Sequence, residues 1–345
     1  MRANRFICQL PWALIATASP LLRQSQEHSA GRWTDLPPVG TGPVQEHGAA
    51  ATSSDLYVIG GISLNASTAS SPPSRYDVSA YNFKTATWRS VASLPLGLTH
   101  ANAAEVDGKI YVLGGLTGDG KNALWIYTTA CLVYDPKLDT WTELPPMAED
   151  QGRGASAVGV FGTTVYLAGG LRSTHLVPGG LEETIDTVTS YDVRTGVWTT
   201  LPSLPAPRDH VAGAVVGTKF FVAGGRDHGH ANFRNTTWAL DLRAPEAGWA
   251  VKSEMPTARG GLASGIIGRH IVTFGGEGNA AAASGVFPQT EAYDVECDEW
   301  TKLDPMPVPR HGMTAASVRG SIFIAGGGIV EAGGEPVDIF TSFTL

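Results

Sequence analysis

Six glycine pairs divide the sequence into units of nearly equal length. Each pair follows a short apolar run, such as LYVIGG ending at Gly61 or FFVAGG ending at Gly225. The second glycines of the pairs are Gly61, Gly115, Gly170, Gly225, Gly276 and Gly327, at intervals of 54, 55, 55, 51 and 51 residues. A period near 50 residues predicts a repeat architecture, in which each unit needs its neighbours to bury its apolar faces.

A tryptophan marker keeps the same period. Five tryptophans each follow a tyrosine–aspartate pair or a variant of it, and they are Trp88, Trp141, Trp198, Trp249 and Trp300. The order of glycine pair, Tyr-Asp element and tryptophan resembles the kelch repeat from about residue 31 to the end. The resemblance implies an all-β six-bladed kelch propeller, in which every blade is a four-stranded sheet.

The two ends of the chain predict how the ring closes. The sixth unit has a glycine pair but no tryptophan after it, whereas Trp33 in RWTDLPP precedes the first unit. We therefore expect the N-terminal strand around Trp33 to complete the last blade and hide its edge. The predicted organisation is a signal peptide at 1–18, a linker at 19–30 and the propeller at 31–345.

Strand parity predicts where polar residues meet. If the strands of a blade run a to d from the channel outward, the d-to-a and b-to-c loops emerge on one face, which we call the loop face. The segment PRDHVAGAVVGTKFFVAGGRDHGH, residues 207–230, encloses strands a and b of the fourth blade. The charged residues at its two ends should therefore meet on the loop face, where long b-to-c loops favour a binding site.

The fourth blade offers the best candidates for acid–base chemistry. We expect Arg208, His210, Asp227 and His228 to be catalytic. Aspartate can orient a histidine, whose ordinary pKa suits proton transfer near neutral pH. A guanidinium group stays charged and donates hydrogen bonds to a substrate oxygen.

Repeated arginines, and aromatic residues that are not part of the repeat motifs, predict the substrate-binding surface. Four units place an arginine sixteen residues before the first glycine of the pair. The expected substrate-binding residues are Trp125, Tyr127, Arg153, Arg226, His230, Phe233, Arg259, Phe287, Arg310 and His311. Trp125 and Tyr127 are expected in the second b-to-c loop. Alternatively, the arginines tie loops to neighbouring carbonyl groups, and the aromatic residues only fasten long loops.

Composition limits the partners. A net charge of −8 argues against a nucleic-acid or anionic-membrane surface, and no later apolar stretch is long enough to span a bilayer.

His228 and His230 with His210 suggest a metal, but no third ligand type recurs at a fixed spacing. We therefore expect no metal, no other cofactor, and a monomer that binds a small molecule. Cys131 and Cys297 are expected to be buried, inert thiols.

The first residues predict a secretory route. Arg2 and Arg5 precede an apolar stretch at 6–15, and the sequence Ala-Thr-Ala at 16–18 fits a signal-peptide cleavage site. Asn65 and Asn235 begin N-glycosylation sequons. We therefore expect a secreted glycoprotein with sugar at these two asparagines.

Loop motifs suggest a function through resemblance. GGLTGDG, GGRDHGH and PTARGGLAS resemble fungal secreted kelch proteins that include cofactor-free hetero-Diels–Alderases of tropolone-sesquiterpenoid pathways. The resemblance implies a secondary-metabolism enzyme that expels water from a hydroxymethyl tropolone and holds the resulting quinone methide against a cyclic sesquiterpene alkene. A carbohydrate-modifying or carbohydrate-binding propeller, similar to kelch mutarotases, and a protein-interaction module are the alternatives.

Overall fold

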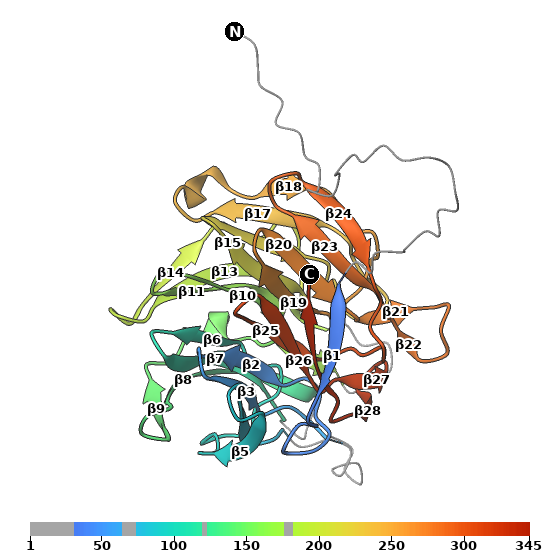
Figure 1. Ribbon diagram of the computed structural model, residues 1–345. Coiled ribbons are helices and arrows are strands. Elements are labelled where there is room, and N and C mark those ends of the chain that lie inside the picture. Colours follow the sequence, from blue (N-terminus) through green and yellow to red (C-terminus); the bar gives the residue numbers. More distant parts are fainter. Residues whose placement is uncertain (1–30, 64–73, 119–122, 176–181) are drawn as a thin grey trace, which may run out of the picture.

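The protein is a six-bladed propeller. The computed structural model describes residues 31–63, 74–118, 123–175 and 182–345, so the predicted signal peptide and the whole of the predicted linker lie outside the described residues. In the described part, six antiparallel sheets of four or five strands surround a central channel (Figure 1). The fold predicted from the glycine and tryptophan repeats is confirmed.

The blades follow one another along the chain, and each runs from its innermost to its outermost strand. The first contains β2 (Gly48–Ala51), β3 (Asp55–Ile59), β4 (Val78–Asn82) and β5 (Thr87–Val91). The second contains β6 (Ala103–Val106), β7 (Lys109–Thr117), β8 (Ala123–Asp135) and β9 (Thr140–Leu144), with β12 (Ser173–His175) also paired to β8. The third contains β10 (Ala157–Phe161), β11 (Thr164–Leu171), β13 (Thr184–Asp192) and β14 (Val197–Leu201).

The second half of the chain repeats this plan. The fourth blade contains β15 (Ala212–Val216), β16 (Lys219–Ala223), β17 (Thr237–Asp241) and β18 (Ala250–Lys252). The fifth contains β19 (Ala263–Ile267), β20 (His270–Phe274), β23 (Thr290–Asp294) and β24 (Glu299–Leu303). Two hairpins, β21 (Glu277–Asn279) with β22 (Gly285–Val286) and β27 (Gly328–Val330) with β28 (Gly334–Pro336), extend from b-to-c loops.

The sixth blade joins both ends of the chain. Its strands are β25 (Thr314–Val318), β26 (Ser321–Ala325), β29 (Phe340–Thr344) and β1 (Arg32–Leu36), so the N-terminal strand is outermost. The Trp33 ring lies 5.0 Å from the ring of Phe343 and 5.4 Å from that of Phe274. The predicted closure of the last blade by the strand around Trp33 is confirmed.

The glycine pairs join neighbouring blades. In all six pairs, the second glycine donates its N–H to a carbonyl of the next blade, at N···O distances of 2.7 to 2.9 Å. At Gly169 and Gly170, the acceptor is the carbonyl of Arg208, and a Cβ on Gly169 would lie 2.3 Å from that oxygen. Only a residue without a side chain allows this close approach, and both glycines have φ in the left-handed region.

Five of the six repeat tryptophans also bind one blade to the preceding one, whereas the indole nitrogen of Trp198 has no hydrogen-bond partner in the described residues. The indole N–H of Trp141 donates to the carbonyl of Ala92, directly after the outermost strand of the first blade, at 2.8 Å. Trp33, Trp88, Trp249 and Trp300 make the equivalent bond at 2.9 to 3.3 Å. The repeated markers of the sequence are therefore contacts of the framework.

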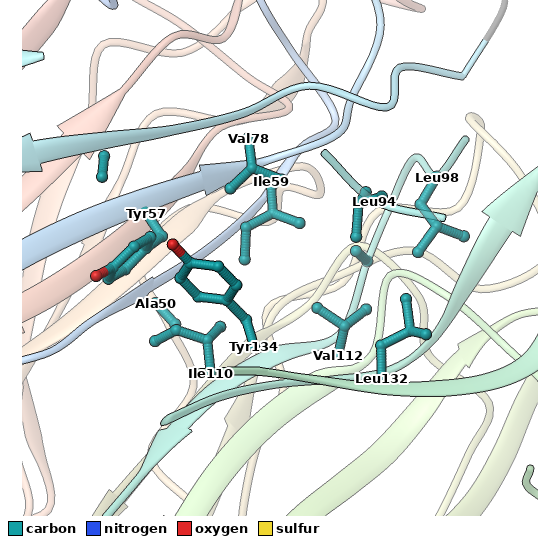
Figure 2. Packing of buried hydrophobic residues seen from close by; sticks show 12 residues of the cluster. Ala50, Tyr57, Ile59, Val78, Leu94, Leu98, Ile110, Val112, Leu132 and Tyr134 are labelled. Atoms are coloured by element: carbon teal, nitrogen blue, oxygen red, sulfur yellow. The ribbon is translucent and has the colours of Figure 1, made fainter. Parts of the chain in front are cut away.

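Apolar side chains fill the space between blades. Figure 2 shows the cluster between the first two blades, in which Tyr57, Ile59 and Val78 face Ile110, Val112 and Tyr134. Ile59, Ile110 and Val112 are fully buried, and each such side chain contributes about 1.5–3 kcal/mol to folding.

Small residues line the central channel. The six innermost strands are neighbours around the axis, and they enclose a cavity of ≈ 380 Å³ bordered mainly by alanine, glycine, serine and valine. Glu46, His100 and His210 also border this cavity. No helix in the described ranges has both the length and the apolar character needed to cross a bilayer.

Candidate functional site

A closed ring of backbone hydrogen bonds forms the channel mouth on the loop face. Each ring residue precedes the innermost strand of its blade and donates its N–H to the ring residue of the preceding blade, at N···O distances of 2.6 to 3.0 Å. The six residues, which we call the mouth ring, are Glu46, His100, Ala155, His210, Gly261 and Gly312. All have φ between 48° and 62°, so the left-handed backbone belongs to the repeat rather than to one side chain.

Three polar side chains of the mouth ring converge. Oε2 of Glu46 lies 3.1 Å from Nε2 of His100 and 3.8 Å from Nε2 of His210. The two imidazole rings are 4.9 Å apart and nearly perpendicular. The missing side chain of Gly312 makes room for them, because a Cβ there would lie 2.2 Å from Oε1 of Glu46.

Arg226 joins a set of buried carboxylates next to the mouth ring. Its guanidinium lies 3.0 Å from Asp209, 2.9 Å from Glu277 and 3.2 Å from Glu182, measured between nitrogen and oxygen. Arg226, Asp209 and Glu277 are each at most 2% exposed. We call these groups, the three polar residues of the mouth ring and the adjacent His311 the mouth cluster. Its members are Glu46, His100, Glu182, Asp209, His210, Arg226, Glu277 and His311.

The two ring nitrogens of His311 have different surroundings. Its Nε2 donates to the carbonyl of Val330 at 2.8 Å. Its Nδ1 lies 3.5 Å from Oε2 of Glu277 and 3.9 Å from Oε1 of Glu46, and it has no hydrogen-bond partner in the described part of the chain. His311 is 1% exposed, so this nitrogen is buried among carboxylates.

The mouth cluster shifts the pKa values of its members in opposite directions. Burial lowers the pKa of His100, although Glu46 opposes this effect. Burial and Arg226 also act to lower the pKa of His210, but Asp209 and Glu46 outweigh them and raise it overall. Burial acts to raise the pKa of Glu46, but the nearby histidines bring it far below the usual range.

A second histidine–aspartate pair lies on the exposed rim of the mouth. Nδ1 of His228 is in hydrogen-bond contact with Oδ1 of Asp227, and the His228 side chain is 43% exposed. The backbone N–H of His228 donates to Oγ1 of Thr184 at 3.1 Å, and that hydroxyl bonds to Asp209. The rim pair is thus connected to the mouth cluster.

The ends of the segment 207–230 meet as parity predicts. Asp209 and Arg226 pair through their backbones, and Asp227 lies 3.8 Å from Arg208 and 3.4 Å from Arg234. His230 is 49% exposed and lies 2.8 Å from a guanidinium nitrogen of Arg226. Arg208, His210, Asp227, His228 and His230 therefore share one region.

The four repeated arginines lie inside the blades. Arg153, Arg208, Arg259 and Arg310 are at most 3% exposed. Arg153 donates to Gln151 and Leu167 carbonyls, and Arg310 to Gly326 and Ile339 carbonyls. Arg259 instead pairs with the buried Glu291. These guanidinium groups are engaged within the framework, and we leave them out of the site that we propose.

The aromatic candidates divide into several environments. Trp125 and Tyr127 lie in strand β8, not in a loop, because the second b-to-c connection is mostly extended strand. This corrects the sequence interpretation. Trp125 is 8% exposed, its ring is 5.2 Å from that of His100, and Tyr127 lies beneath the guanidinium of Arg172.

The two candidate phenylalanines are both half-buried. Phe233 pairs through its backbone with Arg226 and packs where Gly278 has no side chain. Phe287 donates its N–H to the carbonyl of Gly276 at 2.8 Å. Phe233 therefore lies beside the mouth cluster, and Phe287 lies at the base of a b-to-c loop of the fifth blade.

The predictions for the glycosylation asparagines and the cysteines have different outcomes. Asn65 lies outside the described residues, and Nδ2 of Asn235 donates to Glu254 at 3.2 Å. Burial raises the pKa of the Cys131 thiol to about 12, in keeping with an inert residue. Cys297 is half-buried and disulfide-bonded, which corrects the expectation that it is a buried, unpaired thiol.

The sequence interpretation did not select Glu46, His100, Glu182, Asp209 or Glu277. A signal for some of them exists in the repeat. Glu46 and His100 stand fourteen residues before the first glycine of a pair, as His210 does, and Arg226 and Glu277 each follow a glycine pair directly. Comparing equivalent repeat positions would therefore have placed these residues around one mouth.

Comparison with known proteins identifies the family. Residues 171–328 match the KLHDC2/KLHL20/DRC7 kelch-repeats domain, and residues 43–95 and 97–148 match the kelch motif. Kelch-like protein terF of Aspergillus terreus is 40% identical over 326 residues, which cover 92% of this chain and 69% of that protein. The chain belongs to the kelch-repeat family.

Animal relatives are more distant and longer. Kelch-like protein 34 of Homo sapiens is 29% identical over 261 residues, which cover 73% of this chain and 38% of that protein. Kelch-like protein 36 of Rattus norvegicus is 26% identical over 246 residues, covering 70% and 37%. This chain thus spans less than two fifths of either animal relative, in contrast to the fungal one.

Proposed function

We propose that the chain is an enzyme that acts on a small molecule bound at the loop face, with Asp227 and His228 as the proton-transfer pair. The observation that carries this proposal is the exposed imidazole of His228 held by Asp227 next to a buried charged cluster. A carboxylate that orients an imidazole fixes which ring nitrogen faces the ligand. We expect the half-buried Tyr127 and Trp125, which is 8% exposed and whose ring lies 5.2 Å from that of His100, to form the apolar side of this site.

In its specific form, the proposed reaction is a hetero-Diels–Alder addition in fungal secondary metabolism. His228 donates a proton to the side-chain hydroxyl of a hydroxymethyl tropolone, the C–O bond breaks, and water leaves. The ring hydroxyl then gives up its proton, which restores His228 and yields a quinone methide. The quinone methide adds to the alkene of a cyclic sesquiterpene, forming one C–C and one C–O bond with no loss of atoms. The 40% identical fungal relative supports a fungal setting.

The test is turnover by the purified protein. A hydroxymethyl tropolone and a cyclic sesquiterpene alkene are incubated with wild type, His228→Gln and Asp227→Asn, and the adduct is quantified by mass spectrometry. A general acid–base group contributes about 10²–10⁴-fold, so we expect each variant to lose turnover by that order while its melting temperature stays nearly unchanged.

His270→Gln is the matched control. His270 also lies beside an aspartate, 3.6 Å from Asp294, but it stands at the start of β20, at the opposite end of the blade. Its replacement should leave turnover unchanged. No adduct from wild type, or only a few-fold loss in both rim variants, would reject the proposal. Binding of a free sugar without adduct formation would favour the carbohydrate alternative.

A further inference from the structure

Three ligand-type side chains from three blades meet at the channel mouth. Glu46, His100 and His210 come from the first, second and fourth blades, and each offers one ligand atom within 4.8 Å of the others. Their positions are fixed by the mouth ring, whose backbone bonds close around the axis. Two histidines and one carboxylate form a ligand set that suits zinc, iron and other divalent transition metals.

The Nδ1 atoms of His100 and His210, which are the ring nitrogens farther from Glu46, already have hydrogen-bond partners. Nδ1 of His210 lies 2.6 Å from Asp209, and Nδ1 of His100 lies 3.0 Å from Oγ1 of Thr99. The Thr99 hydroxyl donates to the carbonyl of Glu46 at 2.9 Å, so its oxygen can accept from His100. When Nδ1 of a neutral imidazole donates its hydrogen, Nε2 carries the lone pair that a metal ion can bind. Metal-ligating histidines have this arrangement, with the other N–H held by a carboxylate, carbonyl or hydroxyl.

His311 supports the same arrangement independently. Its Nε2–H is used by the carbonyl of Val330, so Nδ1 carries a lone pair when the ring is neutral, and that nitrogen is buried with no hydrogen-bond partner in the described residues. It faces carboxylate oxygens of Glu46 and Glu277 at 3.9 and 3.5 Å. An acceptor buried opposite acceptors is unfavourable unless a proton or a metal cation lies between them.

The mouth cluster also carries an excess of negative charge that a bound cation would balance. Four carboxylates, those of Glu46, Glu182, Asp209 and Glu277, face one permanent positive charge, that of Arg226. Arg226 also lies beside His210, with one guanidinium nitrogen 2.8 Å from Nδ1 and 3.2 Å from Nε2, but it neutralises only one carboxylate. Three negative charges remain for histidine protons or a metal ion to balance, and buried charges are costly when unbalanced.

We propose that Glu46, His100 and His210 bind one divalent transition-metal ion, with His311 as a fourth ligand or close neighbour. The ligand residues border the ≈ 380 Å³ channel cavity, so the open positions of the ion face space in which a ligand oxygen fits. An open position is what separates a reactive metal site from a structural one. This proposal goes beyond the rim reaction and stands without it, and it departs from the expectation of a metal-free site drawn from residue spacing.

The test uses Co²⁺ as the probe. The full-length protein is stripped with a chelator, and visible ligand-field absorption and calorimetry follow the addition of Co²⁺. We expect one ion per chain. Asp209→Asn removes the partner of a ligand and should weaken binding about 10–100-fold. Glu46→Gln, His100→Ala and His210→Ala remove a ligand and should weaken it further. Alanine is tolerated in this backbone, because Ala155 occupies the equivalent ring position with φ of 52°.

Two measurements keep the proposal falsifiable if a variant folds poorly. His270→Ala removes a histidine at the opposite end of a blade and should bind Co²⁺ as wild type does. X-ray absorption of cobalt-loaded wild type should show imidazole nitrogen and carboxylate oxygen ligands. Absence of stoichiometric binding by wild type, or equal affinity in folded His100→Ala and wild type, would overturn the proposal and leave protons and Arg226 as the balancing charges.

Discussion

Arg226 and two of the repeated arginines, Arg153 and Arg310, have the same side chain and are all buried, but their surroundings are opposite. Arg153 and Arg310 donate to neutral carbonyl and hydroxyl oxygens, and burial lowers the pKa of each to about 10. Arg226 lies among three carboxylates, which raise its pKa despite burial. The repeated arginines hold a blade together, whereas Arg226 organises charge at the mouth.

The same contrast applies around the mouth ring. Six residues share one backbone geometry, but Ala155, Gly261 and Gly312 add no polar side chain, whereas Glu46, His100 and His210 converge. Positions at which all units agree form the propeller, and positions at which a few units differ form the site. A variant should therefore affect either stability or ligand binding, according to the kind of position it alters.

The largest effect is expected where the framework closes. A chain that begins at residue 37 lacks β1, which pairs with β29 through five residues, and it exposes an edge strand and the Trp33 contact surface. We expect aggregation or loss of cooperative unfolding, measured by circular dichroism during heating. A chain that begins at residue 26 keeps β1 and should melt like the full chain. Equal melting of both truncations would contradict a closure role for β1.

A smaller effect is expected inside the blades, and its size should depend on the partner. Arg259→Met leaves the fully buried carboxylate of Glu291 without its ion-pair partner, which costs about 3–5 kcal/mol. Arg310→Met leaves only neutral acceptors, which costs about 1–3 kcal/mol. Urea unfolding measures both free energies. The framework assignment fails if either variant keeps wild-type stability.

The fold could be predicted from the sequence because its contacts repeat. Glycine pairs and tryptophans recur at each blade boundary, where Gly170 meets the carbonyl of Arg208 and Trp141 meets that of Ala92. Strand parity also placed Asp227 near Arg208 correctly. These inferences need only the order of strands within one blade.

The mouth cluster could not be predicted in the same way. Glu46, His100 and His210 lie on different blades, and their approach depends on the left-handed ring geometry and on the absence of a side chain at Gly312. Arg226 was selected, but its partner Glu277 was not, because the ion pair joins two blades. The sequence left open whether the repeated arginines face a ligand or neighbouring carbonyl groups, since it shows their period but not where their side chains point; Arg153 and Arg310 donate to carbonyl groups.

The most direct test is to measure the free energy of unfolding in urea for Arg310→Met and His100→Ala, each with and without Co²⁺. An ion present at about 100 times its dissociation constant adds about 2.7 kcal/mol to the free energy of unfolding of a protein that binds it only when folded. We predict that Arg310→Met is less stable than wild type but keeps this gain, whereas His100→Ala loses the gain. A gain that persists in His100→Ala, or that disappears in folded Arg310→Met, would contradict the division between a repeated framework and a mouth that carries the chemistry.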